Sequence, residues 1–348
     1  MNHRFSMVFN RRFTFSAFVA TLVVGAGLPL AEPADAKEVR VYSGRHYNTD
    51  RQVFKEFSDK TGIKVRLIEA RGISLVERPK REGSNSNADM ILLVDAARIN
   101  NAAKAGLLAP YRSAKLDKLV PSEYRDPQGR WYGLTRRVRV IVVNPNKVKP
   151  GTIKTYADLS KPELKGLVCL RKRNNVYNQS LVADQLVLRG QAATKKWLDG
   201  MVANVGQPYF PGDISVVRAV AKGKCGAGIV NHYYVARMLG GVNGSKDVAL
   251  AKKIKVITPN PAHVNVSAGG LAKYAKNKKE AISLLEYLAS TDGSHGLAGP
   301  TYEHPLKGYG QSKILKQFGK FTPDGVTVSE LGENNAKAIK MMAAAGWK

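Results

Sequence analysis

The chain has 348 residues, 44% of them hydrophobic, which is enough for a large core or for two lobes. Its formal net charge of +28 at pH 7 is typical of nucleic-acid-binding proteins, but the basic residues are dispersed through every segment of the chain. We therefore expect a solvated basic surface without a nucleic-acid partner, and a charge that favours docking on an anionic membrane or protein.

The N-terminal segment is typical of an exported protein. Arg11 and Arg12 precede an apolar stretch from Phe15 to about Leu30, and residues 34–36 form an Ala-Asp-Ala cleavage site. The paired arginines predict a twin-arginine signal, with an ordinary secretory signal as the alternative. In either case residues 1–36 form a signal peptide that is cleaved after Ala36, and the apolar stretch is too short for a membrane-spanning helix.

The mature chain begins with strands that alternate with helices. Strands are predicted at 39–43, 64–68 and 88–94, with helices at 49–60 and 96–105 that end at Gly62 and Gly106. This alternation indicates a parallel, doubly wound α/β sheet. Further along the chain a new strand–helix series begins at 155–159. The pattern then predicts strands at 167–170, 227–230 and 254–257 and helices at 179–189, 191–203, 231–239, 278–290 and 328–345.

Two segments of the chain are predicted to be extended strands that do not fit within a single lobe. Residues 131–144 form the first, and a linker-like Asn-Pro-Asn stretch follows it; residues 265–271 form the second. We interpret both as strands that cross between two α/β lobes. Lobe one would hold 37–136 and 271–312, and lobe two would hold 137–270 and 313–348. One continuous sheet through residues 90 and 170 would contradict this interpretation.

The chain has two cysteines, Cys169 and Cys225, both in or beside predicted strands. In an oxidising compartment they could form one disulfide, and two buried thiols are the alternative. Neither has metal-ligand spacing to another Cys or His, which argues against a zinc site.

The most informative segment follows the strand predicted at 227–230. Asn231 is a good N-cap for the next helix, whose first turn holds Tyr233 and Tyr234. Their side chains project about 100° apart, so they cannot share one packed face of the helix. Both can nevertheless reach a ligand in front of the helix N-terminus. Arg237 lies one turn on and is expected to lower the pKa of either phenol. Phenolates suit a hard, highly charged cation such as ferric iron.

Two other tyrosines occupy equivalent places in the chain. Tyr47 follows the strand predicted at 39–43, and Tyr177 follows the strand predicted at 167–170. Ligands of open α/β sheets bind at the carboxyl ends of the strands, where all four tyrosines are expected. The common location is hard to explain by packing, so we predict that Tyr47, Tyr177, Tyr233 and Tyr234 form one site.

These residues make the chain resemble the periplasmic ferric-ion-binding proteins of iron ABC transporters, most closely the cyanobacterial iron-uptake members. The resemblance covers the whole mature chain and rests on segments 42–47, 155–159 with Pro162 and Gly166, 175–179, and 231–234 with Arg237. It implies a two-lobed, transferrin-like trap of the type II class, monomeric and periplasmic. Such a trap closes on one ferric ion and delivers it to an ABC permease at the inner membrane.

The resemblance also implies roles for single residues. The ligands would be Tyr47 from lobe one and Tyr177, Tyr233 and Tyr234 from lobe two, while His46 could ligate or only line the cleft. Four phenolates around a trivalent ion leave a charge of −1, which Arg237 would offset, with Arg137 on the first crossing strand as a second candidate.

Some features of the sequence also fit functions other than iron capture. The segment 155–166 is shared by binding proteins for iron and for polyamines, so a polyamine-type protein fits it as well. Arg171, Arg173 and Arg237 could instead hold an anion such as phosphate. An exported basic enzyme is a weaker alternative, because the P-loop, the Gly-x-Ser-x-Gly motif and the His-Glu-x-x-His motif are all absent from the sequence. We expect a protein that is not an enzyme.

Overall fold

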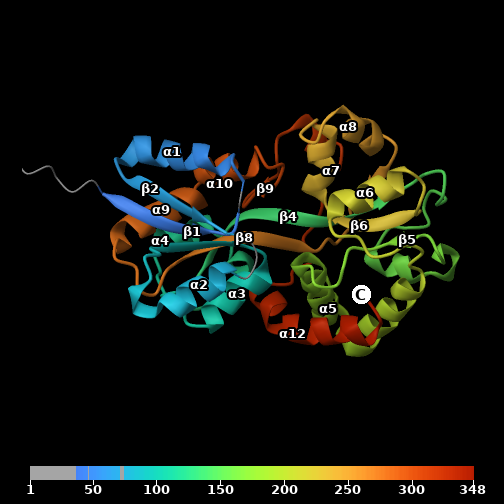
Figure 1. Cartoon of the computed structure of the whole chain (residues 1–348), viewed down its shortest axis with the longest axis horizontal. Coiled ribbons are helices and arrows are strands. Elements are labelled where there is room, and N and C mark those ends of the chain that lie inside the picture. Colours follow the sequence, from blue (N-terminus) through green and yellow to red (C-terminus); the bar gives the residue numbers. More distant parts are fainter. Residues whose placement is uncertain (1–36, 46, 71–73) are drawn as a thin grey trace, which may run out of the picture. The chain divides into compact units, whose positions relative to one another are not determined.

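The computed structural model describes residues 37–45, 47–70 and 74–348 (Figure 1). The predicted signal peptide, with Arg11 and Arg12, and the candidate ligand His46 lie outside these residues. Within them, no helix is both long enough and apolar enough to cross a membrane.

The first half of the mature chain forms one sheet. Strands β1 (Glu38–Ser43), β2 (Lys64–Glu69) and β3 (Met90–Val94) run parallel, with β1 paired to both of the others. Helix α1 (Asp50–Thr61) buries Val53, Phe54 and Phe57, and it ends where Gly62 adopts φ 71° and donates its N–H to the carbonyl of Ser58. Figure 1 shows α2 (Ser74–Glu82) and α3 (Ala96–Lys104) on the other face of this sheet from α1.

Strand β4 (Tyr132–Val143) is buried along its whole length because it is shared by both halves of the sheet. Its first half, 132–138, pairs with β8 (Val264–Leu271), and β8 pairs in turn with β3. Its second half, 139–143, pairs with β6 (Ala227–Asn231) and β7 (Lys255–Ile257), and β6 pairs with β5 (Val168–Cys169). The strands from β2 to β5 thus belong to one hydrogen-bonded sheet, so the result that argues against two separate sheets is found. The sheet passes from one half to the other within β4.

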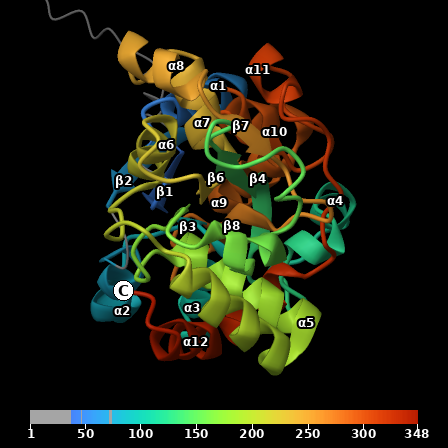
Figure 2. The same cartoon turned by 90° about the vertical axis from the view of Figure 1, so that its right-hand side faces the viewer.

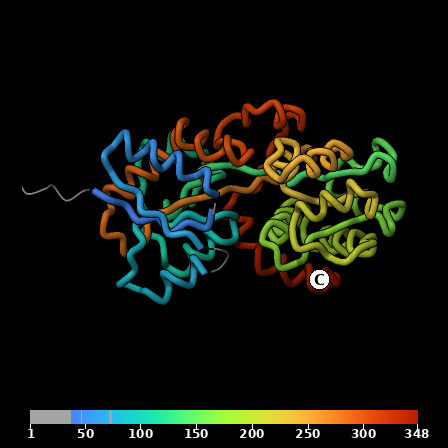
Figure 3. The backbone as a smooth tube through the Cα atoms, turned by 45° about the horizontal axis from the view of Figure 1, so that its top comes forward, coloured from blue at the N-terminus to red at the C-terminus, as the bar shows by residue number. Residues whose placement is uncertain are grey.

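The second extended run that the sequence predicted, 265–271, is found as strand β8. Residues 264–271 lie as a central strand between β3 and β4, and the link from β7 is made by 258–263, where Arg139 donates its backbone N–H to the carbonyl of His263. The glycines of β8 permit this central place, because a Cβ at Gly270 would meet the carbonyl of Arg130. In Figure 3 the green strand β4 and the orange strand β8 run together through the middle of the trace.

The helices around the second half of the sheet match most of the predicted pattern. The two helices expected at 179–189 and 191–203 form one run, α5 (Val176–Ala203), which is interrupted at Gly190 by a non-helical backbone with φ 74° and ψ 173°. Helix α12 (Val328–Ala344) packs against both α5 and α3 (Figure 2). Residues 156–160, expected to begin a strand–helix series, form a 3₁₀ turn. The remaining elements are α4 (Ala114–Leu119), α6 (Asp213–Ala221), α7 (His232–Leu239), α8 (Ser245–Ala251), α9 (Lys278–Ala289), α10 (Thr291–Ala298), β9 (His304–Pro305) and α11 (Lys313–Lys316).

The two cysteines form a disulfide. Cys169 at the end of β5 and Cys225 before β6 have Cα atoms 5.8 Å apart, and both are buried. The bond therefore ties two neighbouring strands that precede predicted ligand-bearing helices, and it decides between the alternatives that the sequence left open.

Candidate metal centre

Three strand–helix junctions carry the predicted tyrosines. Tyr47 lies in the loop between β1 and α1, Tyr177 is the second residue of α5, and Tyr233 and Tyr234 are the second and third residues of α7. Burial is the main cause that raises the pKa of Tyr233, and the nearby phenols of Tyr177, Tyr234 and Tyr47 raise it further. The four phenols are therefore close enough to interact electrostatically. The structure thus brings the four predicted tyrosines together.

Tyr233 and Tyr234 also contact each other, a contact that the sequence did not predict. Their ring centroids are 4.4 Å apart with an angle of 38° between the planes. Tyr233 is fully buried and Tyr234 is partly exposed. The side chains leave the helix in different directions, but they bend toward the same space at its N-terminus.

Asn231 occupies the predicted N-cap position without capping the helix through its side chain. Its Nδ2 donates to the hydroxyl of Tyr233 at 3.2 Å, and its Oδ1 accepts from Nη1 of Arg139 at 3.3 Å. The amide therefore orients a phenol of the site, and the orphan N–H groups of the first turn of α7 receive no bond from it.

Four arginines surround two of the tyrosine rings. The guanidinium carbons of Arg45 and Arg237 each lie 5.1 Å from the ring centroid of Tyr47. Those of Arg137 and Arg171 lie 5.4 and 5.7 Å from the ring centroid of Tyr177. Each ring thus contacts two cations within the distance of a cation–π interaction, which places positive charge around the phenol cluster.

The pKa of the two phenols of α7 is raised, not lowered as the sequence predicted, and Arg237 is not among the main groups that act on either of them. Burial raises the pKa of Tyr233 and of Tyr234 above the ordinary value, and it raises the pKa of Tyr47 as well. Burial disfavours the charged phenolate more strongly than any neighbouring cation favours it. Arg137 is among the groups that oppose the rise in the pKa of Tyr233 and of Tyr47, whereas Arg237 lies over the ring of Tyr47.

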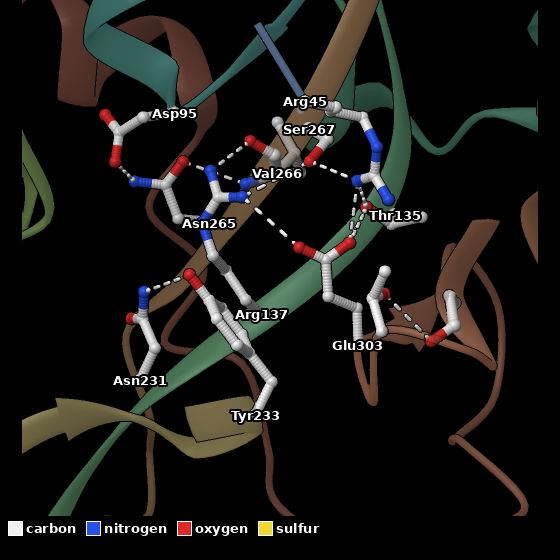
Figure 4. A network of polar contacts seen from close by, with 12 residues as sticks. Arg45, Asp95, Thr135, Arg137, Asn231, Tyr233, Asn265, Val266, Ser267 and Glu303 are labelled. Carbon is white, nitrogen blue, oxygen red and sulfur yellow. Dashed lines mark hydrogen bonds and ion pairs between the residues drawn. The ribbon is translucent and has the colours of Figure 1, made fainter. Parts of the chain in front are cut away.

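Behind the phenols lies a buried ionic network centred on Arg45 and Glu303 (Figure 4). Nη1 of Arg45 donates to Oε2 of Glu303 at 2.7 Å and to Oγ of Ser267 at 2.7 Å, and Nε of Arg45 donates to Asp50 at 2.9 Å. Both Arg45 and Glu303 are 0% exposed. Since Arg45 lies two residues before Tyr47, the network fixes the loop that carries this phenol.

Glu303 also faces Arg137. Its Oε1 lies 3.7 Å from Nη1 of Arg137, whose Nη2 donates to the carbonyl of Val266 at 2.5 Å. Burial would raise the pKa of Glu303, but Arg45 and Arg137 outweigh it and hold the pKa below its ordinary value. The carboxylate therefore partly neutralises the arginines around the site. Sequence reasoning missed both Arg45 and Glu303.

The arrangement suits a hard cation better than an anion. Four phenol oxygens are donors of the kind that ferric iron prefers, and the surrounding arginines can compensate the charge of phenolates. Of the residues suggested for an anion, Arg171 is already ion-paired with Asp213 at 3.2 Å. In the described part of the chain, Asp184, His263 and Asp324 are the one group of three or more His, Cys, Asp or Glu side chains close enough to hold a metal.

Comparisons with known proteins agree with this geometry. Residues 85–316 match the family model described as bacterial extracellular solute-binding protein. Iron uptake protein A1 of Synechocystis sp. is 39% identical over 97% of this chain and 99% of its own length. The solved structure of the Trichodesmium protein IdiA, or FutA, in complex with iron and citrate has a TM-score of 0.85 and 40% identity, covering 89% of this chain and 100% of that chain. Ferric iron-binding protein A of Mannheimia haemolytica, in an open conformation, has a TM-score of 0.83 and 34% identity, covering 90% and 99%.

These likenesses extend over nearly the whole of each relative, and they confirm the predicted type II, two-lobed α/β fold. The chain belongs to the family of bacterial extracellular solute-binding proteins, in the branch of periplasmic ferric-ion-binding proteins.

Proposed function

We propose that the protein captures ferric iron in the periplasm with the phenolates of Tyr47, Tyr177, Tyr233 and Tyr234, and delivers it to an ABC importer in the inner membrane. The main support for this proposal is that four phenols, which follow three different strands, lie close together and are surrounded by four arginines. The relatives named above support it, because their printed names describe iron uptake or ferric iron binding.

In the free protein the phenols of Tyr47, Tyr233 and Tyr234 are neutral, since burial raises the pKa of each. Ferric iron would displace the phenol protons, so each bond formed to iron releases a proton to solvent. Four phenolates leave one net negative charge on the complex. Arg137 and Arg237 offset this charge, and His46, water or an exogenous anion completes the coordination.

The capture is organised by the two lobes. Lobe one comprises 37–136 and 271–312, and lobe two comprises 137–270 and 313–348. Lobe two holds three of the phenols on two rigid helix termini, so it binds the ion first, and Tyr47 of lobe one then closes the site. The protein acts as a monomer, is exported by a twin-arginine signal cleaved after Ala36, and performs no catalysis.

Adding ferric citrate to the iron-free protein tests the proposal. We expect a visible phenolate-to-iron charge-transfer band that disappears on reduction or acidification, because both remove the ferric–phenolate pairing. Tyr274→Phe, which changes a tyrosine that is 43% exposed, should leave the band unchanged. A colourless protein whose melting temperature rises with phosphate would instead support an anion trap. A protein that responds to neither would support the enzyme alternative.

A further inference from the structure

An open groove of about 660 Å³ lies next to one of the proposed ligands in the chain. Val176 and Gln179, which flank Tyr177 at the start of α5, line one side of it. Helices α2, α3 and α12, the residue that follows α3 and the loop before α5 supply the rest of the lining. The other residues are Val76, Glu77, Lys80, Ala97, Arg98, Asn101, Lys104, Ala105, Asn174 and Asn335.

The groove has an excess of unpaired positive charge. Lys80, Arg98 and Lys104 face one acidic residue, Glu77. None of these four side chains forms an ion pair within the part of the chain that the structure describes. The neighbouring surface differs, because Arg78 of the same helix α2 pairs with Glu82 at 2.7 Å. Cations left unpaired on a concave surface attract an anionic ligand.

The polar groups of the groove also have unused hydrogen-bonding capacity. Asn335 of α12 is 7% exposed, and its Nδ2 has no hydrogen-bond acceptor. That Nδ2 atom is itself inaccessible to solvent, so Asn335 lines the groove without offering a donor to a ligand there. Asn101 and Asn174, by contrast, are exposed and can donate. The lining therefore offers donors and cations to a ligand rich in acceptors.

We propose that this groove binds an organic polycarboxylate, the chelator with which ferric iron arrives, and so positions the chelate at the start of α5, the helix that carries Tyr177. Several carboxylates match three separated cations and the amide donors, and the volume is that of a small-molecule site, far more than a single inorganic phosphate fills. The inference rests on the proposed iron capture. During transfer each iron–carboxylate bond that breaks is replaced by an iron–phenolate bond, the phenol proton passes to the released carboxylate or to water, and iron stays ferric.

Calorimetric titration of the iron-free protein with citrate tests the groove directly. Arg98→Gln combined with Lys104→Gln should weaken citrate binding at least tenfold, since two charge-assisted contacts are removed. The matched control, Lys252→Gln with Lys253→Gln, makes the same change in net charge at exposed positions after α8, and it should weaken binding less than twofold. Equal effects of the two pairs, or no binding of citrate to the wild type, would overturn the proposal.

A second measurement separates this inference from iron capture itself. Loading is followed from ferric citrate and from ferric acetohydroxamate, a neutral complex without carboxylates. The Arg98→Gln, Lys104→Gln double variant should take up iron from ferric citrate several-fold more slowly than the control double variant. The two should take up iron from the hydroxamate at the same rate. Unchanged loading from both donors would overturn the delivery role. A wild type that binds citrate in the groove but takes iron from neither donor would refute iron capture while leaving the polycarboxylate site standing.

Discussion

At the scale of single residues, the sequence predicts the phenols but not the charges that surround them. Each tyrosine follows a strand directly, so its place at the sheet edge can be inferred from the local pattern. Arg45 and Glu303 are separated by 258 residues and are joined only by the fold. No local sequence pattern predicts such a pair. The direction of the pKa shifts of the phenols depends on burial, which only the structure reveals.

Arg137 is expected to control the pH dependence of iron loading more than Arg237. Loading removes phenol protons, and Arg137 lowers the pKa of Tyr47 and Tyr233 against the effect of burial. Arg137→Gln should therefore raise these pKa values further and shift the pH of half-loading upward by about one unit. Arg237→Gln makes the same charge change and should shift it less. The measurement is the charge-transfer absorbance as a function of pH, and a larger shift for Arg237→Gln would identify that residue as the counter-charge.

At the scale of elements, strands and helices with a regular apolar pattern were predicted within a few residues of their observed bounds. Helix α2 was not predicted, because Pro79 lies within it and interrupts the helical pattern. The segment at 156–160 was predicted as part of a strand–helix series, but its Thr155–Asp158 capping box closes a 3₁₀ turn. In both cases a local capping or packing interaction outweighs the average propensity of the residues.

The break in α5 should depend on glycine. Gly190 has φ 74° and ψ 173°, a conformation that residues with a Cβ rarely adopt, although no atom lies within 4 Å of an added Cβ. Gly190→Ala should therefore lower the free energy of unfolding by about 2 kcal/mol through backbone strain alone. Gly212→Ala is the control, since Gly212 has an extended backbone with equally open surroundings, and should cost at most about 1 kcal/mol. Urea denaturation compares them, and equal costs would contradict the role of φ.

Asp184, His263 and Asp324 form a cluster that joins α5, the segment 258–263 and the loop before α12; we call it the hinge cluster. His263 Nδ1 lies 3.0 Å from Asp184 Oδ1. Burial, together with Asp184, raises the pKa of Asp324 to about 9. Folded Asp324 thus retains a proton that the unfolded chain loses near pH 4, at about the ordinary value for Asp. The free energy of unfolding should consequently fall as pH rises between these two values.

Asp324→Asn, which resembles the protonated acid, should remove this slope. We expect the variant to be more stable than the wild type at pH 8.5 by at least about 1 kcal/mol, with a smaller difference at pH 6. Asp59→Asn makes the same change at an exposed position of α1 and should leave the slope unchanged. Urea denaturation at both pH values measures the difference, and parallel pH profiles for wild type and Asp324→Asn would refute a retained proton.

At the scale of the whole molecule, the sequence predicts two lobes from two extended runs, 131–144 and 265–271, but not which strands and helices these runs pack against. Strand β8 pairs with both β3 and β4, and α12 contacts the helices α3 and α5. Such contacts join segments far apart in the chain and leave no periodic pattern. The lobe boundaries therefore remain a prediction, whereas the two-lobed class is confirmed by relatives of known structure.

Loss of the Tyr47 hydroxyl should affect the closing of the two lobes more than the initial binding of ferric iron. If three phenols of lobe two bind the ion first, Tyr47→Phe keeps a coloured complex but loses iron to citrate about tenfold faster, and its iron-loaded form is more open, because differential affinity drives closure. Tyr234→Phe should impair capture itself. Citrate competition and small-angle X-ray scattering measure the two effects. If Tyr47→Phe loses iron as completely as Tyr234→Phe, capture is not asymmetric.

The central claim is that four phenolates hold the ferric ion, and anomalous diffraction at the iron edge from crystals of the iron-loaded protein tests it most directly. We predict one strong anomalous peak within bonding distance of the hydroxyl oxygens of Tyr47, Tyr177, Tyr233 and Tyr234. A peak in the hinge cluster of Asp184, His263 and Asp324, or a peak that the four phenols do not surround, would contradict the account.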